Sequence, residues 1–292
     1  MLSLFTKTNG KSNDLLNFLT TFRKKSIISL QEDEKQSLQR LKGDGAIRFP
    51  DYINSEICKR LESKLSHLQG NSKPKGPAQE GKNFSECEKF VDSFSLKPTD
   101  LINDPDVQSI FTDPMILNLV EAYFEKAPIL SAICAWWSTS NKISPNAESE
   151  NAQMYHFDME RIKWLKYFIY VNDVTLINGP HCFVKGTHLS GQQPFEIRKK
   201  GYTRIPDHEI QKLFPQEKIE VFTGKRGTGI LEDTRGYHKG MPPSQGKRLI
   251  LQMEYCSSLF GVNSNTSGIL KNYSPCLKEC LRKNKKFDAN FR

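Results

Sequence analysis

The side chains best suited to chemistry lie in two short segments that are far apart in the chain. The first segment is Tyr155-His156-Phe157-Asp158, and the second contains His238. Side chains two positions apart on an extended strand point to the same side, so His156 and Asp158 can face one point in space. A histidine from a distant strand would complete two histidines and one carboxylate on one face of a metal. That arrangement leaves coordination positions open and is typical of non-haem Fe(II) oxygenases.

An isolated His-x-Asp is weak evidence, because a hydrogen-bonded strand histidine is the ordinary alternative. The flanking segments favour the metal site. Residues 163–171 (KWLKYFIYV) are rich in aromatic and β-branched residues and predict a core strand. Residues 247–255 (KRLILQMEY) alternate loosely and predict the strand that carries Arg248. The guanidinium of Arg248 could pair with the far carboxylate of a keto-acid cosubstrate.

The remaining elements predict a sheet system with helices added before it. We expect helices over 32–41, over 55–68 with Asn54 or Ser55 as the cap, and over 104–124 with a break at Asp113-Pro114. Further strands are expected at 46–49, 129–139 and 181–184, and surface loops at 70–82 and 140–151. The second loop directly precedes the metal motif, so it could cover a substrate.

The length allows one large domain or two small ones, and the spread of the motif residues favours one; the charge favours an anionic partner. The chain has 292 residues, 37% of them hydrophobic, and no apolar run approaches the ~20 residues of a membrane span. The net charge is +9 and the pI is about 9.1, which favours a phosphate, a carboxylate, CoA, an acidic carrier protein or nucleic acid as partner. Seven scattered cysteines contain no CxxC pair, so we expect a reducing, cytoplasmic environment.

The two ends of the chain are expected to be peripheral. Residues 1–30 form an N-terminal extension, residues 31–262 the domain, and residues 263–292 a basic C-terminal tail, either solvated or a short helix. Cys276 and Cys280 would lie one helical turn apart there, but two cysteines without further ligands do not make a zinc site.

Three segments together resemble the phytanoyl-CoA dioxygenase family of Fe(II)- and 2-oxoglutarate-dependent oxygenases. They are YHFD at 155–158, FIYVNDVTLINGPHCFVKGTH at 168–188, and GTGILEDTRGYHKGMPPSQGKRLILQMEY at 227–255. The stretch LKGDGAIRFPDYINSEICKRLESKL at 41–65 is also similar to the family's first strand and helix. The resemblance covers most of the chain. It implies a mainly β fold with helical additions, built on a double-stranded β-helix, a jelly-roll-like and cupin-like core.

The resemblance also implies a set of site residues. His156, Asp158 and His238 would hold Fe(II) and act as the catalytic centre, and Arg248 would bind 2-oxoglutarate. Tyr170 lies where the family often places an aromatic near 2-oxoglutarate, although a core tyrosine is an equal alternative. Independently of the resemblance, Gln153 lies three residues before His156 and could reach the cosubstrate or the substrate, or it could be a loop amide exposed to water.

The implied activity is an oxygenase that hydroxylates a small molecule with O2 and releases succinate and CO2. Halogenating relatives replace the carboxylate by a small residue, and Asp158 is present here, so hydroxylation is favoured. Two alternatives stay open: a cupin-like metalloenzyme that needs no keto acid, and an inactive binding module that uses its basic tail. Nucleic acid is not the expected partner. His181 and His188 are interpreted as structural, and the sequence makes no prediction of the oligomeric state.

Overall fold

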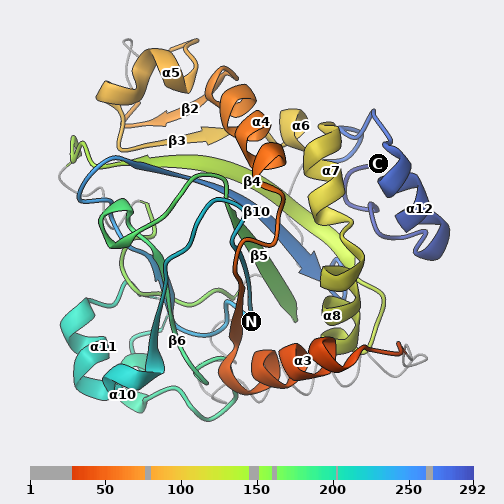
Figure 1. Ribbon diagram of the computed structural model, residues 1–292. Helices are drawn as coiled ribbons and strands as arrows, with labels where there is room; N and C mark the ends of the chain where they lie inside the picture. The colour runs from red at the N-terminus through yellow and green to blue at the C-terminus, as the bar shows by residue number, and fades with distance from the viewer. Residues whose placement is uncertain (1–27, 76–79, 145–150, 160–162, 202, 261–265) are drawn as a thin grey trace.

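The protein consists of two packed β-sheets with helices on both outer sides (Figure 1). The computed structural model describes residues 28–75, 80–144, 151–159, 163–201, 203–260 and 266–292. The predicted N-terminal extension therefore lies almost entirely outside the described residues, as does half of the loop expected at 140–151. The layers run from one group of helices through the larger sheet and the smaller sheet to a second, smaller group of helices.

The larger sheet has seven strands in the order β1-β8-β5-β10-β4-β3-β2. All of its pairings are antiparallel. Its strands are β1 (Ala46–Phe49), β2 (Gly70–Lys73), β3 (Ser93–Leu96), β4 (Ile129–Thr139), β5 (Trp164–Tyr170), β8 (Gly229–Glu232) and β10 (Lys247–Cys256). The central strand, β10, is the last of these seven strands in the sequence, and it joins two groups of three strands.

The smaller sheet faces the larger one and carries part of the site. It contains β6 (His181–Val184) between β7 (Ile219–Phe222) and β9 (His238–Gly240). A single antiparallel bridge extends it, because His156 pairs with His238, and the preceding residue Tyr155 pairs with Ile205 outside the sheet. The segment that contains the metal motif is therefore attached to this sheet by one residue and does not form a long strand.

Helices cover the outer face of each sheet. On the larger sheet and its edges lie α3 (Glu32–Asp44), α4 (Ser55–Ser66), α5 (Phe84–Cys87), α6 (Pro98–Ile102), α7 (Pro105–Phe111), α8 (Pro114–Phe124) and α12 (Pro275–Lys283). Next to the smaller sheet lie α10 (Phe195–Arg198) and α11 (Asp207–Leu213) (Figure 1). Short 3-10 turns occupy Glu88–Phe90, Leu176–Asn178 and Gln216–Lys218.

Local sequence explains the predicted break between α7 and α8. Each helix begins with an aspartate followed by proline, Asp104-Pro105 and Asp113-Pro114. The aspartate side chain accepts hydrogen bonds from backbone N–H groups of the first turn, and proline suits the first helical position because it has no N–H to satisfy. Asp113-Pro114 is therefore the start of a second helix, and the predicted break is confirmed.

The two faces of the central strands have different surroundings, but both are covered. This accounts for the weak alternation of apolar and polar residues along these strands. On β10, Leu249, Leu251 and Met253 pack among the helices in the principal core. The residues between them face the space between the sheets, where Ile250 packs with Phe168. Because both faces are covered, apolar residues occur on both. Polar residues on the inner face are therefore not explained by exposure to solvent, and they indicate a functional site.

The predicted surface loop at 70–82 is wrong at its beginning. Residues Gly70–Lys73 form the edge strand β2, which pairs with β3. Its sequence, GNSK, has poor strand propensity, so the register of the neighbouring strand determines its conformation. A short, polar edge strand also limits pairing with other molecules.

The C-terminal segment contributes to the principal core. Of the two alternatives for its conformation, the structure contains the short helix, α12. Leu277, Phe287 and Phe291 are fully buried in the same core as the larger sheet, and the backbone oxygen of Phe287 accepts a hydrogen bond from Leu130 at the start of β4 (2.8 Å). The basic side chains of the segment lie outward, so its charge and its packing are on opposite sides.

Among the described residues, none of the helices is long and apolar enough to cross a membrane. All seven cysteines are free.

We predict that Phe287→Ala destabilises the whole domain. The ring lies between Phe111 and Tyr255, at centroid distances of 6.1 and 6.3 Å, and its removal leaves a buried cavity. Loss of a buried phenylalanine costs about 3–5 kcal/mol of the free energy of unfolding. Chemical denaturation followed by tryptophan fluorescence measures this cost. The exposed Lys286→Ala is the matched control and should change the free energy by less than about 0.5 kcal/mol. Equal stability of the two variants would contradict the packing.

Candidate metal centre

Two histidines from distant parts of the chain are paired through their backbones. The N–H of His156 donates to the carbonyl of His238 (3.0 Å), and the N–H of His238 donates to the carbonyl of His156 (2.9 Å). Directly opposed residues in an antiparallel pair project their side chains to the same side. The two imidazole rings accordingly lie 4.3 Å apart between centroids.

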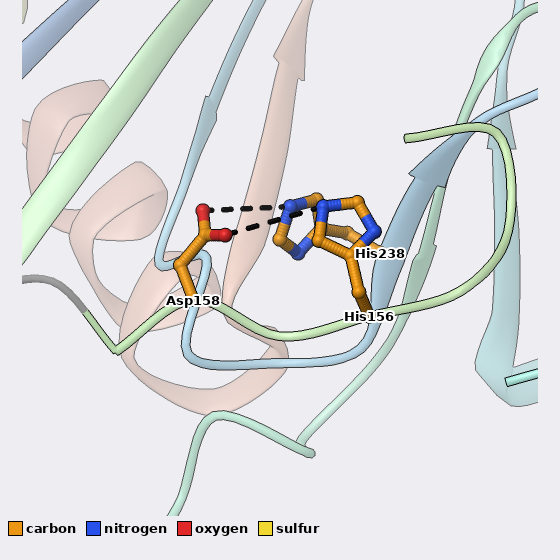
Figure 2. Close-up of side chains that lie close together, drawn as sticks. All are labelled: His156, Asp158 and His238. Atoms are coloured by element: carbon orange, nitrogen blue, oxygen red, sulfur yellow. Dashed lines mark ion pairs between the residues drawn. The ribbon is translucent and has the colours of Figure 1, made fainter. Parts of the chain in front are cut away.

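Asp158 completes the group. Its backbone N–H donates to the carbonyl of Thr234 (2.8 Å), which fixes the chain two residues after His156. One carboxylate oxygen lies 4.0 Å from Nε2 of His156, and the other lies 3.6 Å from Nε2 of His238 (Figure 2). One ligand atom from each of the three residues lies within 4.8 Å of the others, so a single ion can contact all three.

The hydrogen bonds of the histidines prepare the nitrogens for a metal. Nδ1 of His156 lies 2.9 Å from the carbonyl oxygen of Met154, and Nδ1 of His238 lies 3.0 Å from that of Gly236. A carbonyl can only accept, so each Nδ1 carries a proton and each Nε2 keeps a free lone pair. Second contacts of this kind orient metal-binding histidines in proteins generally.

Burial and charge favour the protonation states that a cation requires. Burial lowers the pKa of His156 well below its usual value, helped by His238, and burial likewise lowers the pKa of His238. Burial alone would raise the pKa of Asp158, but Lys166 and then the two histidines hold that pKa below its usual range. Two neutral imidazoles and an ionised carboxylate are the ligand forms of these residues. The three residues therefore fit a divalent iron ion.

The turn before His238 is held in place by a buried ion pair. Arg235 donates to both carboxylate oxygens of Asp233, and the hydroxyl of Tyr123 on α8 donates to the same carboxylate (2.7 Å). Gly236 allows the turn to approach β6, since a Cβ at that position would lie 2.4 Å from the ring of Phe183. The position of His238 therefore depends on contacts with both the helical layer and the smaller sheet.

A cavity of about 250 Å³ opens beside the three residues, between the two sheets. Its floor comes from alternate residues of the central strands of the larger sheet. Its lining also contains side chains from the metal motif and the smaller sheet. The lining residues are Trp136, Asn151, Ala152, His156, Asp158, Lys166, Phe168, His181, Arg204, His238, Gly240, Arg248, Ile250 and Gln252.

Arg248 lies in this lining as a buried cation. The residue is 2% exposed, and the contacts of its guanidinium are long ones, to the carbonyl of Met241 (3.3 Å) and the hydroxyl of Ser138 (3.5 Å). Its Nε has no hydrogen-bond partner, and no described carboxylate lies within ion-pair distance of it. Gly240 makes room for it, since a Cβ there would lie 2.9 Å from Nη2. A buried guanidinium without an anion is a site for one.

Comparison with known proteins agrees with this geometry. Residues 41–249 match the family model described as "Phytanoyl-CoA dioxygenase (PhyH)". The chain belongs to the phytanoyl-CoA dioxygenase family. It is therefore an enzyme of the Fe(II)- and 2-oxoglutarate-dependent oxygenase class, and the predicted resemblance is confirmed. No relative matched among curated protein sequences.

Solved structures resemble the phytanoyl-CoA dioxygenase fold of this chain at low sequence identity. HygX from Streptomyces hygroscopicus, with nickel and 2-oxoglutarate bound, is 15% identical with a TM-score of 0.56, over 84% of this chain and 95% of that one. The epimerase SnoN from nogalamycin biosynthesis, with Fe3+, alpha ketoglutarate and nogalamycin RO, is 15% identical with a TM-score of 0.54, over 77% and 84%. EctD from S. alaskensis is 13% identical with a TM-score of 0.54, over 81% and 82%. These likenesses confirm the predicted jelly-roll fold.

Two residues that were expected near the cosubstrate do not line the cavity: Tyr170, placed there by the family resemblance, and Gln153, placed there by its position in the chain. The hydroxyl of Tyr170 donates to the carbonyl of Phe222 (2.7 Å) and accepts from the backbone N–H of His181 (2.8 Å), so it joins β5 to the smaller sheet. This is the core alternative for Tyr170. Gln153 is buried, which also differs from the water-exposed alternative, but the lining includes its neighbour Ala152 and not Gln153 itself.

The interpretation of His181 as purely structural is incomplete. Its ring lines the cavity and lies 5.8 Å from that of His238, whereas its Nε2 lies 2.8 Å from a carboxylate oxygen of Glu232. His188 does not line the cavity; its Nε2 lies 3.2 Å from the carbonyl of Lys42.

Sequence reasoning missed Lys166. This lysine also lines the cavity and donates to the carboxylate of Asp158 (2.7 Å). A signal was present, because Lys166 is separated by two from Phe168 and by four from Tyr170, and it therefore shares the inner face of β5 with them.

We predict that His238→Ala abolishes measurable Fe(II) binding at concentrations that saturate the unaltered protein. Loss of a residue that only supports a ligand weakens metal binding about 10–100-fold, and loss of the ligand itself should exceed that. Anaerobic calorimetric titration with Fe(II) measures the affinity. The matched control is His188→Ala, which removes a buried histidine outside the cavity lining and should leave the affinity unchanged. Parallel loss in both variants would contradict the assignment of the ligands.

Proposed function

We propose that the protein is a 2-oxoglutarate-dependent hydroxylase that uses Fe(II) and O2 to oxidise a small molecule, with release of succinate and CO2. Family membership supports the oxygenase class. The ligand group supports iron, and the retained carboxylate of Asp158 supports hydroxylation over halogenation, since it occupies the position that a halide would need. The free cysteines fit a reducing cytoplasm, in which iron stays ferrous.

The observation that carries this proposal is the buried guanidinium of Arg248, which lies in the same cavity as the three ligands and has no carboxylate partner among the described residues. A buried charge is unfavourable unless an opposite charge meets it. 2-Oxoglutarate has a carboxylate at each end, so one end can reach the metal while the other pairs with Arg248. In a metalloenzyme that needs no keto acid, this cation would have to pair with an anionic group of the substrate.

Each residue has a role in binding and orientation. His156, Asp158 and His238 would hold the metal from one side, and the positions left open would be available to the keto acid and to O2. When bound, Fe(II) with 2-oxoglutarate and O2 supplies the oxidation of an unactivated C–H bond. Arg248 fixes the direction of the keto acid, because its planar fork matches a carboxylate.

The surroundings of the ligands exclude water from the reaction. The side chains of His156, Asp158 and His238 are each less than a tenth exposed, and Trp136, Phe168 and Ile250 provide apolar walls. A dry site strengthens the charge interactions of the ligands and protects reactive species from side reactions.

We predict that anaerobic titration with Fe(II) and 2-oxoglutarate produces the weak visible absorption band of a metal–keto-acid chelate. The band should be absent in His156→Ala, which lacks a ligand. A bound metal without the band would support the metalloenzyme that needs no keto acid. Absence of metal binding in the unaltered protein would support the inactive binding module.

We predict that Arg248→Ala weakens 2-oxoglutarate binding at least about 30-fold but leaves Fe(II) affinity unchanged. Removal of one partner from a buried, hydrogen-bonded charge pair costs about 2–5 kcal/mol. Titration of the Fe(II)-loaded variant with 2-oxoglutarate, followed by the same band, gives the affinity. Arg60→Ala, on the exposed side of α4, is the control and should bind normally. Unaltered affinity in Arg248→Ala would exclude this residue as the cosubstrate ligand.

A further inference from the structure

A row of ionisable residues crosses the larger sheet beside the metal ligands. On three neighbouring strands, Lys166 of β5 lies directly between Glu232 of β8 and Glu254 of β10. The exposed fraction of each glutamate is 1% or less, so the row is in the interior. Charged residues on the inner face of a jelly roll are unfavourable unless each is paired, so the row needs a physical reason.

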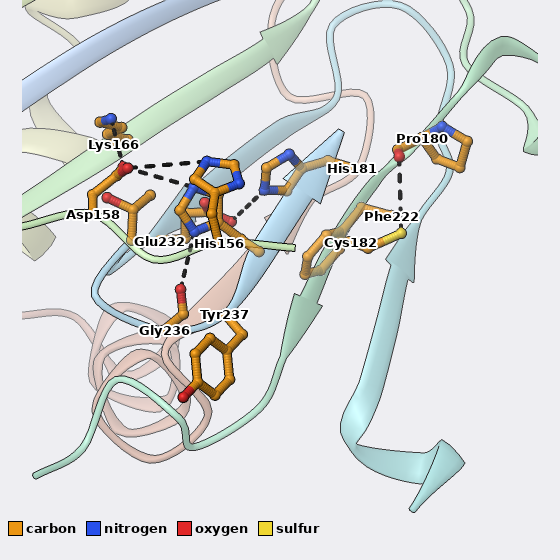
Figure 3. A network of polar contacts seen from close by, with 12 residues as sticks. His156, Asp158, Lys166, Pro180, His181, Cys182, Phe222, Glu232, Gly236 and Tyr237 are labelled. Carbon is orange, nitrogen blue, oxygen red and sulfur yellow. Dashed lines mark hydrogen bonds and ion pairs between the residues drawn. The ribbon is translucent and has the colours of Figure 1, made fainter. Parts of the chain in front are cut away.

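Lys166 connects this row to the metal ligand. Its ammonium donates to Oδ2 of Asp158 (2.7 Å) and lies 3.9 Å from a carboxylate oxygen of Glu254 (Figure 3 shows the contact with Asp158). The other oxygen of Glu254 accepts a hydrogen bond from the hydroxyl of Ser131 on β4 (2.7 Å). The chain of contacts therefore runs from the metal ligand through the lysine to two further strands.

A lysine beside a metal ligand has two opposite effects. Its positive charge repels a divalent cation and weakens metal binding. Its hydrogen bond holds the carboxylate in one orientation, which strengthens binding because the ligand does not have to be ordered. Glu254 offsets the first effect, since a nearby negative charge compensates most of the lysine's field. No contact among the described residues opposes the ordering of the carboxylate by the hydrogen bond, so this ordering should outweigh the repulsion between the lysine and the cation.

We propose that Lys166 is a positioning residue that orients the Asp158 carboxylate for the metal, and that Glu254 and Ser131 hold Lys166 in place. The ammonium engages Oδ2 and leaves Oδ1 free for the ion. A carboxylate that binds through one oxygen keeps the other coordination positions available to a chelating keto acid. This inference rests on the proposed metal site, but not on the identity of the cosubstrate or the substrate.

The test is the affinity for Co(II), measured by anaerobic calorimetry and by the visible absorption of the bound ion. The key variant is the double substitution Lys166→Met/Glu254→Gln, which removes one positive and one negative charge and keeps the side chains similar in size. We expect Co(II) binding to weaken about 10–100-fold, the usual effect of losing a partner of a metal ligand. The absorption of the bound ion should also change, because the carboxylate is free to bind differently.

Two further variants separate orientation from general damage. Lys166→Arg keeps a donor to Asp158 and should recover most of the affinity. Lys239→Met removes another buried lysine, which pairs with Asp207 outside the cavity lining, and should leave both the affinity and the absorption unchanged. A purely structural role for buried lysines would make the two sites behave alike.

Unchanged or tighter Co(II) binding in the double variant would overturn the proposal, because it would make Lys166 only a source of repulsion. If the double variant does not fold, Glu254→Gln alone carries the test: a smaller loss of affinity is expected, and no loss overturns the proposal. Failure of the proposed function is a different result. In that case, the unaltered protein would bind Co(II) without any effect of 2-oxoglutarate, while the comparison among the lysine variants would remain valid.

Discussion

The site depends on one pair of backbone hydrogen bonds, those between His156 and His238. Side chains are flexible, but opposed residues in an antiparallel pair have a fixed separation and direction. Since this one pairing fixes both ligands, a slip of one residue in its register would turn one imidazole to the opposite face and separate the two rings. Asp158 is attached to the same unit through Thr234, which lies in the turn just before His238. The metal geometry is thus a property of the smaller sheet.

The larger sheet provides the surroundings of the three metal ligands. Alternate residues of its central strands either join the helical core or face the ligands, so the same strands provide both stability and the cavity floor. Along β10 the inner face changes from Arg248 through Ile250 and Gln252 to Glu254, which places a cation for the keto acid and an anion for Lys166 at opposite ends. One strand therefore organises the charges on two sides of the metal.

The sequence was most informative where chemistry and periodicity coincide. His156, Asp158, His238 and Arg248 were identifiable because rare residue types lie beside strongly strand-forming segments, and the structure brings all four to one cavity. The strand at 129–139 was predicted with its observed bounds for the same reason. The spacing of Lys166 to Phe168 placed it on the inner face of its strand, but its position between Glu232 and Glu254 depends on cross-strand register, which a single chain does not reveal. The strand at Gly70–Lys73 was missed because tertiary pairing outweighs its weak propensity.

The central position of β10 has a consequence for how the protein is made. Before residue 247 leaves the ribosome, the larger sheet can exist only as two separate groups of strands, β1-β8-β5 and β4-β3-β2. In each group, the edge strand that later pairs with β10 has unpaired backbone groups, and such edges can pair with other chains. Contacts between residues so distant in sequence also form slowly. The exposed strand edges of the nascent chain therefore need protection from association until β10 emerges. A product truncated before β10 would aggregate instead of folding into a smaller domain.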